Sequence, residues 1–348
     1  MHMSDALMTP AVGGVMWGAT AVATAYCAKK VREDLDESKI PLMGVAGAFV
    51  FAAQMLNFSI PGTGSSGHIG GGLLLAALLG PYAAFLVIAS VLGIQALFFA
   101  DGGLLALGAN IFNLGFFPAL IAFPLVYRMI AGDDPTRSRI VAGSITAAVI
   151  GLLLGALGVI LQTTASGIAE LPFTAFATLM LPIHLAIGVV EGLVTAGVLL
   201  FVYQAQPEIL ARSASGRSLS GVKMKPVVVG LLAAALVSGG AVAWFASADP
   251  DGLEWAIEGV AGTDEIEGAT ASAHKRVGAV QERLSFLPDY GFREGDEGVA
   301  AGGGGSGPII DLGTTVAGIV GAAITLGAAA LIGVVLRRRS SSQAPGTP

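Results

Sequence analysis

Two of the four histidines in this 348-residue chain stand where they could bind a metal ion. His2 directly follows Met1 in "MHMSDALMTP", and His68 lies in the Gly- and Ser-rich stretch "PGTGSSGHIGGG". The Met1 amino group and the backbone nitrogen of His2 can close a five-membered ring on a metal. The same backbone nitrogen and the imidazole Nδ1 can close a six-membered ring. An imidazole nitrogen from His68 would complete a square of four nitrogens, so we hypothesise a metal chelate at these residues.

The geometry of this hypothetical site restricts the metal. Square-planar nitrogen sites suit Ni²⁺ or Cu²⁺, and Co²⁺ tolerates the same ligands. Mg²⁺ and Ca²⁺ prefer oxygen ligands, and Zn²⁺ prefers a tetrahedron. Two plainer interpretations stay open: His2 could be a chance residue or a cloning remnant, and His68 could be an incidental histidine in a surface loop.

The surroundings of His68 favour the metal interpretation. Glycine lets the backbone approach a ligand closely and adopt unusual angles. A non-helical segment at membrane depth is tolerated only where it lines a cavity or is buried in protein. We therefore expect residues 57–72 to form a loop that presents His68 from the outer face.

Other polar residues could support such a site. His184 and Glu191 are seven residues apart and so share one helical face; ionisable groups inside a membrane are costly and usually functional. We expect them to support the site or to fix helix packing rather than to bind the metal. Asp101, Asn110 and Asn113 in "DGGLLALGANIFN" should lie near the outer mouth, either as a turn with a helix cap or as partners for the second ring nitrogen of a metal-binding histidine.

The composition shows which elements must position these residues. The chain is 54% hydrophobic and 12% charged, with a mean hydropathy of +0.77, whereas soluble domains contain roughly 25% charged residues. No alternating strand pattern of a barrel is present. The sequence therefore predicts an all-α integral membrane protein. The first apolar run lacks a basic n-region and a cleavage site, so we expect Met1 to be retained.

Basic loops predict how the chain crosses the membrane. A span needs about 20 apolar residues, and Lys and Arg favour the cytoplasmic side. The run 69–99 is long for one span, and "LLGPY" (78–82) could divide it. With that division every basic loop falls inside, which gives nine spans, an outside N-terminus and an inside C-terminus. Part of the run could instead form a re-entrant helix rather than a full crossing. The predicted runs are 9–28, 40–57, 69–99 in two parts, 104–127, 138–162, 175–203, 226–246 and 311–336.

The spans group into two units. The first is a seven-span helical bundle, and the second is a two-span hairpin with an extracytoplasmic loop that carries twelve acidic residues against four basic ones. Such a loop could concentrate cations near the mouth, or help to insert or open the N-terminal segment. The predicted boundaries are 1–205 for the seven-span bundle, 206–225 for a cytoplasmic linker, 226–336 for the two-span hairpin with loop 247–310, and 337–348 for a basic, disordered tail. Within the loop, 297–308 is predicted to be a flexible linker.

Four motifs in the first unit resemble the CbiM/NikM family. They are "MHMSDAL", "PGTGSSGHIGGGLLLAALLGP", "DGGLLALGANIFNLG" and "HLAIGVVEGLVT". This family comprises the substrate-capture subunits of energy-coupling-factor ABC transporters for cobalt and nickel. The resemblance implies that Met1, His2 and His68 hold the metal. It also implies a scaffold (T) subunit and two ATPase subunits as partners in the cytoplasmic membrane.

Two motifs in the second unit resemble the CbiN/NikN accessory class. "DPDGLEWA" (249–256) and "LPDYGF" (287–292) are similar to its PDGLE signature. The chain is therefore expected to fuse a capture subunit to an accessory subunit. The "SGH" form of the loop looks more like the nickel branch, while cobalt stays open and would supply cobalamin biosynthesis.

The absence of certain motifs argues against ATP hydrolysis and metalloprotease activity in this chain. No phosphate-binding loop is present, so we expect ATP hydrolysis only in separate subunits, and no H-E-x-x-H motif supports a metalloprotease. We expect no organic cofactor and, beyond the partner subunits, contact with membrane lipid but not with nucleic acid. Two alternatives remain: a membrane metal sensor or adaptor that binds without transport, and a membrane enzyme that uses the metal as a Lewis acid with Glu191 as base.

Overall fold

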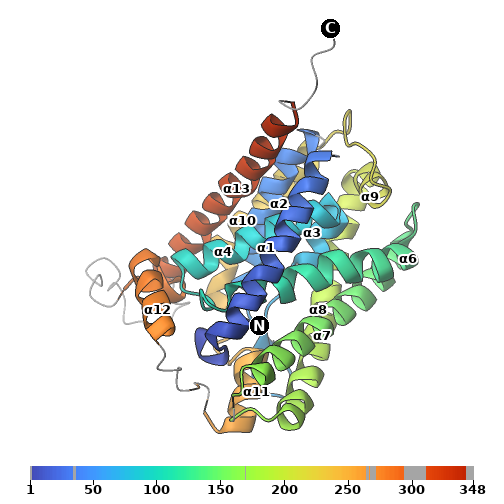
Figure 1. Cartoon of the computed structure of the whole chain (residues 1–348). Coiled ribbons are helices and arrows are strands. Elements are labelled where there is room, and N and C mark those ends of the chain that lie inside the picture. Colours follow the sequence, from blue (N-terminus) through green and yellow to red (C-terminus); the bar gives the residue numbers. More distant parts are fainter. Residues whose placement is uncertain are drawn as a thin grey trace.

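The computed structural model describes residues 2–33, 37–168, 170–263, 266, 272–293 and 311–341. Nearly all of the described chain is helical, which confirms the predicted all-α membrane fold (Figure 1). Six helices in the described part are long and apolar enough to cross a membrane. The chain is therefore a multi-pass membrane protein.

The helices of the first unit form most of the bundle. They alternate with short turns, and the π-helix η3 contains Pro118 and Pro124, which lack the N–H that a regular helix requires. The elements are η1 (Asp5–Leu7), α1 (Pro10–Glu33), η2 (Glu37–Lys39), α2 (Ile40–Gln54), α3 (Gly72–Leu79), α4 (Pro81–Phe98), α5 (Leu107–Ile111), η3 (Phe112–Tyr127), α6 (Arg128–Ala131), α7 (Arg137–Ala165) and α8 (Phe173–Ala205).

The second unit packs against the first rather than standing apart. Helices α10 and α13 cross closely at Gly239 and Gly318, where an added Cβ would meet the other backbone at 3.1 Å or less, and small residues of this kind allow close packing in membranes. Both helices also contact α2, whose residues 42–54 are all buried. The elements are α9 (Pro207–Ala214), α10 (Lys225–Gly240), η4 (Val242–Phe245), α11 (Gly252–Ala261), α12 (Ser272–Leu284), η5 (Pro288–Tyr290) and α13 (Leu312–Ser341).

The run 69–99 is divided where the sequence predicted. Helix α3 ends before Gly80, which has a φ of +87°, and α4 begins at Pro81. Gly80 lines one cavity together with Lys30, Lys39 and Arg128, so the basic segments meet at the same end of the bundle. The eight residues of α3 extend only about 12 Å, less than the roughly 30 Å of a bilayer core. The number of complete crossings therefore stays a prediction.

A small β-hairpin lies within the loop predicted for residues 57–72. Strand β1 (Phe58–Ile60) pairs antiparallel with β2 (Ser65–Gly67), in the register Phe58 opposite Gly67. The connecting turn uses Gly62 and Gly64 at positive φ, a conformation that glycine adopts without steric penalty. His68 follows directly after β2, so the hairpin fixes the point from which its side chain projects.

The predicted linker, loop and tail contain more helix than expected. Helix α9 lies inside the linker 206–225, and α11, α12 and η5 lie inside the loop 247–310. The tail prediction was wrong at its start, because α13 continues to Ser341. The predicted flexible linker 297–308 and residues 342–348 lie outside the described residues.

Candidate metal centre

The N-terminal segment is held inside the protein by its own backbone. Asn110 accepts a hydrogen bond from the Met3 N–H at 2.8 Å and donates one to the Met3 carbonyl at 3.1 Å. The Gly103 N–H donates to the same carbonyl at 2.9 Å. The side chains of Met3 and Met8 are buried in the core. These contacts place His2 at the end of a fixed segment.

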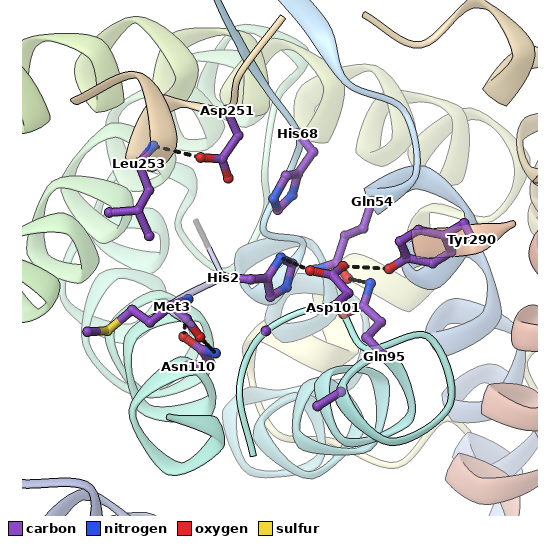
Figure 2. A network of polar contacts seen from close by, with 12 residues as sticks. His2, Met3, Gln54, His68, Gln95, Asp101, Asn110, Asp251, Leu253 and Tyr290 are labelled. Carbon is purple, nitrogen blue, oxygen red and sulfur yellow. Dashed lines mark hydrogen bonds and ion pairs between the residues drawn. The ribbon is translucent and has the colours of Figure 1, made fainter. Parts of the chain in front are cut away.

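His2 and His68 lie side by side, although they come from distant parts of the sequence. Their rings are stacked, with centroids 5.0 Å apart and 10° between the planes (Figure 2). Burial lowers the pKa of both side chains from 6.5 to about 3. Both imidazoles are therefore neutral near pH 7, which is the form that binds metals.

The hydrogen bonds of each ring decide which nitrogen carries a lone pair. Nδ1 of His68 lies 3.0 Å from the Ile69 carbonyl, so Nδ1–H donates and the lone pair is on Nε2. Nδ1 of His2 lies 3.1 Å from Oδ1 of Asp101. Nε2 of His2 is buried without a hydrogen-bond partner among the described residues.

The contact between His2 and Asp101 bears directly on the chelate hypothesis. That hypothesis assigns Nδ1 of His2 to the metal, and the structure instead pairs Nδ1 with a carboxylate. Loading by the chelate must therefore exchange Asp101 for the metal. Met1, whose amino group would be the first ligand, lies outside the described residues. Within the described residues, no group of three His, Cys, Asp or Glu side chains could hold a metal ion.

His184 and Glu191 share a helical face but contact different groups. Oε1 of Glu191 accepts a hydrogen bond from the Gly71 N–H at 3.0 Å, three residues after His68. Nδ1 of His184 lies 2.8 Å from the Met180 carbonyl in its own helix. Glu191 thus supports the segment that presents His68, whereas His184 only packs beside that segment.

Two glutamines that the sequence analysis missed connect the segments around the histidines. Gln54 donates to the Gly70 carbonyl at 2.8 Å, and Gln95 donates to Oε1 of Gln54 at 2.9 Å. The Gln95 carbonyl accepts the Asp101 N–H at 3.2 Å. The signal for both was an amide side chain in an otherwise apolar helix, a residue that needs a buried partner.

Asn113 takes a different place from Asn110. Its amide exchanges two hydrogen bonds with Gln162, at 2.8 and 3.0 Å, and lies 3.9 Å from the sulfur of Met3. Asn113 therefore contacts the Met3 side chain of the N-terminal segment and makes no hydrogen bond to the histidine rings among the described residues.

The second unit, the accessory hairpin formed by α10, α13 and the segment between them, contacts the surroundings of His68 through its PDGLE segment (250–254). Asp251 caps α11, because its carboxylate accepts the N–H groups of Leu253 and Glu254 at 2.7 and 3.0 Å. The preceding Pro250 carbonyl accepts the Ser66 N–H at 2.7 Å, which ties the segment to β2. The sequence indicated the PDGLE motif but not its contact with the β1–β2 hairpin, which precedes His68.

His2 and His68 line an open cavity of about 570 Å³. Tyr290 hydrogen-bonds Asp101 at its edge at 2.5 Å, and His274 contacts the Met8 carbonyl at 2.9 Å. The lining contains acidic residues from both units, and such a cavity raises the local concentration of cations. The acidic side chains are Asp5, Asp101, Asp251, Glu254 and Asp289.

Two family models match different parts of the chain. The model of the family described as "Cobalt uptake substrate-specific transmembrane region" matches residues 2–209. The PDGLE domain model matches residues 225–338. The two matches therefore correspond to the bundle and to the accessory hairpin.

Individual relatives are metal transport proteins by name. A protein of Archaeoglobus fulgidus, provisionally named a fused nickel transport protein NikMN, is 31% identical over 94% of this chain and 96% of its own length. The cobalt transport protein CbiM of Sorangium cellulosum is 33% identical over 61% of this chain and 95% of its own length. A crystal structure of a transition metal transporter is 30% identical, covers 59% of this chain and 93% of that one, and has a TM-score of 0.52.

Proposed function

This chain belongs to the family of cobalt uptake substrate-specific transmembrane proteins and carries a PDGLE domain behind that region, and from this premise we propose that it captures Ni²⁺ or Co²⁺ for import. The metal is the transported substrate. The chain acts as the substrate-binding membrane subunit of an energy-coupling-factor ABC transporter. Imported cobalt would supply cobalamin biosynthesis.

One observation supports this proposal most strongly: the buried imidazole of His2, at the end of a fixed N-terminal segment, stacks on the buried imidazole of His68. The ligands we propose are the Met1 amino group, the backbone nitrogen and Nδ1 of His2, and Nε2 of His68. Backbone nitrogens complete the set, so the site needs no third metal-binding side chain. A late transition metal is required, because only a strongly polarising ion acidifies the amide enough for its proton to be released to water when the metal binds.

The surrounding residues have supporting roles in this proposal. Asn110 holds the N-terminal segment in place through Met3, and Glu191 holds the backbone after His68. Asp101 occupies Nδ1 of His2 until the metal replaces it. The acidic cavity attracts the cation from solution, so we place this face and the N-terminus outside the cytoplasmic membrane and the C-terminus inside.

The domain boundaries follow the same division. We propose a capture domain over residues 1–205, a connection over 206–225 and an accessory domain over 226–336. A scaffold subunit and two ATPase subunits would bind the chain and drive release of the metal on the cytoplasmic side. The chain itself would perform no catalysis.

Metal binding by the purified chain tests the first part of the proposal. The full chain, stripped with a chelator, should bind one Ni²⁺ or Co²⁺. His68→Ala should weaken binding at least about a hundredfold, because loss of a residue that only supports a ligand already costs about ten- to a hundredfold. The control is His274→Ala, which removes an imidazole from the same cavity but no proposed ligand. Equal losses in the two variants would contradict the assignment of His68.

Transport is tested separately from binding. Cells that make the chain together with scaffold and ATPase subunits should accumulate nickel or cobalt, and cells with an inactive ATPase should not. Binding without accumulation in the complete system would instead support the sensor or adaptor alternative.

A further inference from the structure

The carboxylate of Asp101 lies between two side chains from distant parts of the chain. Its Oδ1 is 3.1 Å from Nδ1 of His2, and its Oδ2 accepts a hydrogen bond from the hydroxyl of Tyr290 at 2.5 Å. Figure 2 shows the three side chains in a row, with Asp101 in the middle. This row joins the candidate metal centre to the accessory hairpin.

The backbone around Tyr290 fixes the position of its hydroxyl. Asp289 and Tyr290 have φ values of +50° and +59°, a left-handed conformation that non-glycine residues seldom adopt. The Asp289 N–H donates to the Phe99 carbonyl at 2.8 Å, and the Tyr290 ring stacks on that of Phe99 at 5.1 Å. Tyr290 is therefore anchored to the same chain segment that carries Asp101.

Metal loading changes the number of partners that Asp101 has. The proposed chelate takes Nδ1 of His2, so loading breaks the contact with Oδ1 and the ring changes tautomer: its proton leaves Nδ1 and Nε2 is protonated instead, while Asp101 stays ionised. The Asp101 side chain is only 23% exposed, and a largely buried carboxylate without a partner is unfavourable. Among the described residues, the Tyr290 hydroxyl still donates to Oδ2 of Asp101 when His2 has turned to the metal.

We propose that Tyr290 is a positioning residue for metal loading, which holds the Asp101 carboxylate when His2 leaves it. This inference rests on the proposed function. It gives the accessory hairpin a direct effect on metal affinity without contributing a ligand. The effect passes through one hydroxyl group, so it can be removed without disturbing the hairpin.

A double-mutant cycle tests the proposal. Tyr290→Phe removes the hydroxyl and keeps the ring that stacks on Phe99, and Asp101→Asn removes the charge that the hydroxyl must stabilise. Ni²⁺ affinity is measured by equilibrium titration of the purified full chain for the wild type, both single variants and the double variant. Tyr203→Phe, at the far end of α8, is the control for loss of a tyrosine hydroxyl.

The two proposals predict a specific pattern. Tyr290→Phe should weaken Ni²⁺ binding about tenfold when Asp101 is present, the expected effect of losing a hydrogen bond to a buried charge. The same substitution in the Asp101→Asn background should change affinity less than about twofold, because no buried charge is left to stabilise. Equal effects in both backgrounds, or no effect in either, would overturn the proposal, since a purely structural role of Tyr290 would not depend on the charge of Asp101.

Failure of the proposed function can be recognised in the same experiment. If the wild type binds neither Ni²⁺ nor Co²⁺, or if His2→Ala binds as tightly as the wild type, both proposals fall. If the wild type binds and requires His2 but the cycle is additive, only the role of Tyr290 is rejected.

Discussion

Nδ1 of His2 lies 3.1 Å from Oδ1 of Asp101, while Nε2 of the same ring has no hydrogen-bond partner among the described residues. Two ways of binding a metal are compatible with this contact. In the chelate, Nδ1 leaves Asp101 and closes a ring with the backbone nitrogen. In the other arrangement, Nε2 binds the metal and Asp101 keeps the ring oriented, as carboxylates often do for metal-binding histidines. Only the chelate requires a free amino group at Met1.

A substitution at Gly103 should displace the N-terminal segment from its packing site. A Cβ at this position would overlap the Asp5 backbone nitrogen and carboxylate, whereas one at Gly93 meets nothing within 4 Å. Overpacking typically costs about 1–3 kcal/mol, so we expect Gly103→Ala to weaken Ni²⁺ binding about five- to hundredfold. Gly93→Ala should leave affinity unchanged. Titration of both purified variants checks this, and equal affinities would show that the segment can be displaced without loss.

Glu191 should act as the hydrogen-bond acceptor for the Gly71 N–H and not as a base. Glu191→Ala leaves the buried Gly71 N–H without its partner, and the loss should weaken metal binding about tenfold. Glu191→Gln keeps an acceptor oxygen, so its affinity should stay within about threefold of the wild type. If the glutamine variant were as impaired as the alanine variant, the carboxylate would have a chemical role, as the enzyme alternative requires.

Docking of the accessory hairpin can be weakened at Gly252. An added Cβ would lie 2.7 Å from Cδ1 of Ile187 and 3.2 Å from Cε1 of His184, while one at Gly278 meets nothing within 4 Å. We expect Gly252→Ala to lower nickel uptake by at least about half in cells that contain the partner subunits, because displacement of α11 moves the PDGLE segment from the cavity. Gly278→Ala should transport normally. Normal uptake by both variants would mean that this docking surface is dispensable.

Much of the fold could be predicted because its signals are local. Apolar length and basic loops predicted the helices and the break at Gly80, since a Gly–Pro pair ends one helix and begins the next. The β-hairpin was missed because each of its strands has only three residues and because β2 consists of Ser and Gly alone. Helix α9 was missed because it has only eight residues and leads into the basic, Ser-rich stretch 212–225, which is typical of a connection.

The candidate site was predictable only in part. The chelating potential of a terminal Met1–His2 sequence is a property of local chemistry, so it could be read directly. The partners of Asp101 could not, because Tyr290 lies 189 residues away and reaches it only when the accessory hairpin has docked. The same holds for Gln54 and Gln95, whose contact depends on how α2 and α4 pack.

The most direct test of the account is the Ni²⁺ affinity of a chain extended by a few residues before Met1, measured before and after a protease removes the extension to leave Met1 first. Intact-mass analysis confirms both termini. The chelate predicts that the extended chain binds at least about a hundredfold more weakly, because its amino group no longer lies beside the His2 backbone nitrogen, and that cleavage restores binding. Equally tight binding by the extended chain would contradict the chelate and leave Nε2 of His2 as the ligand.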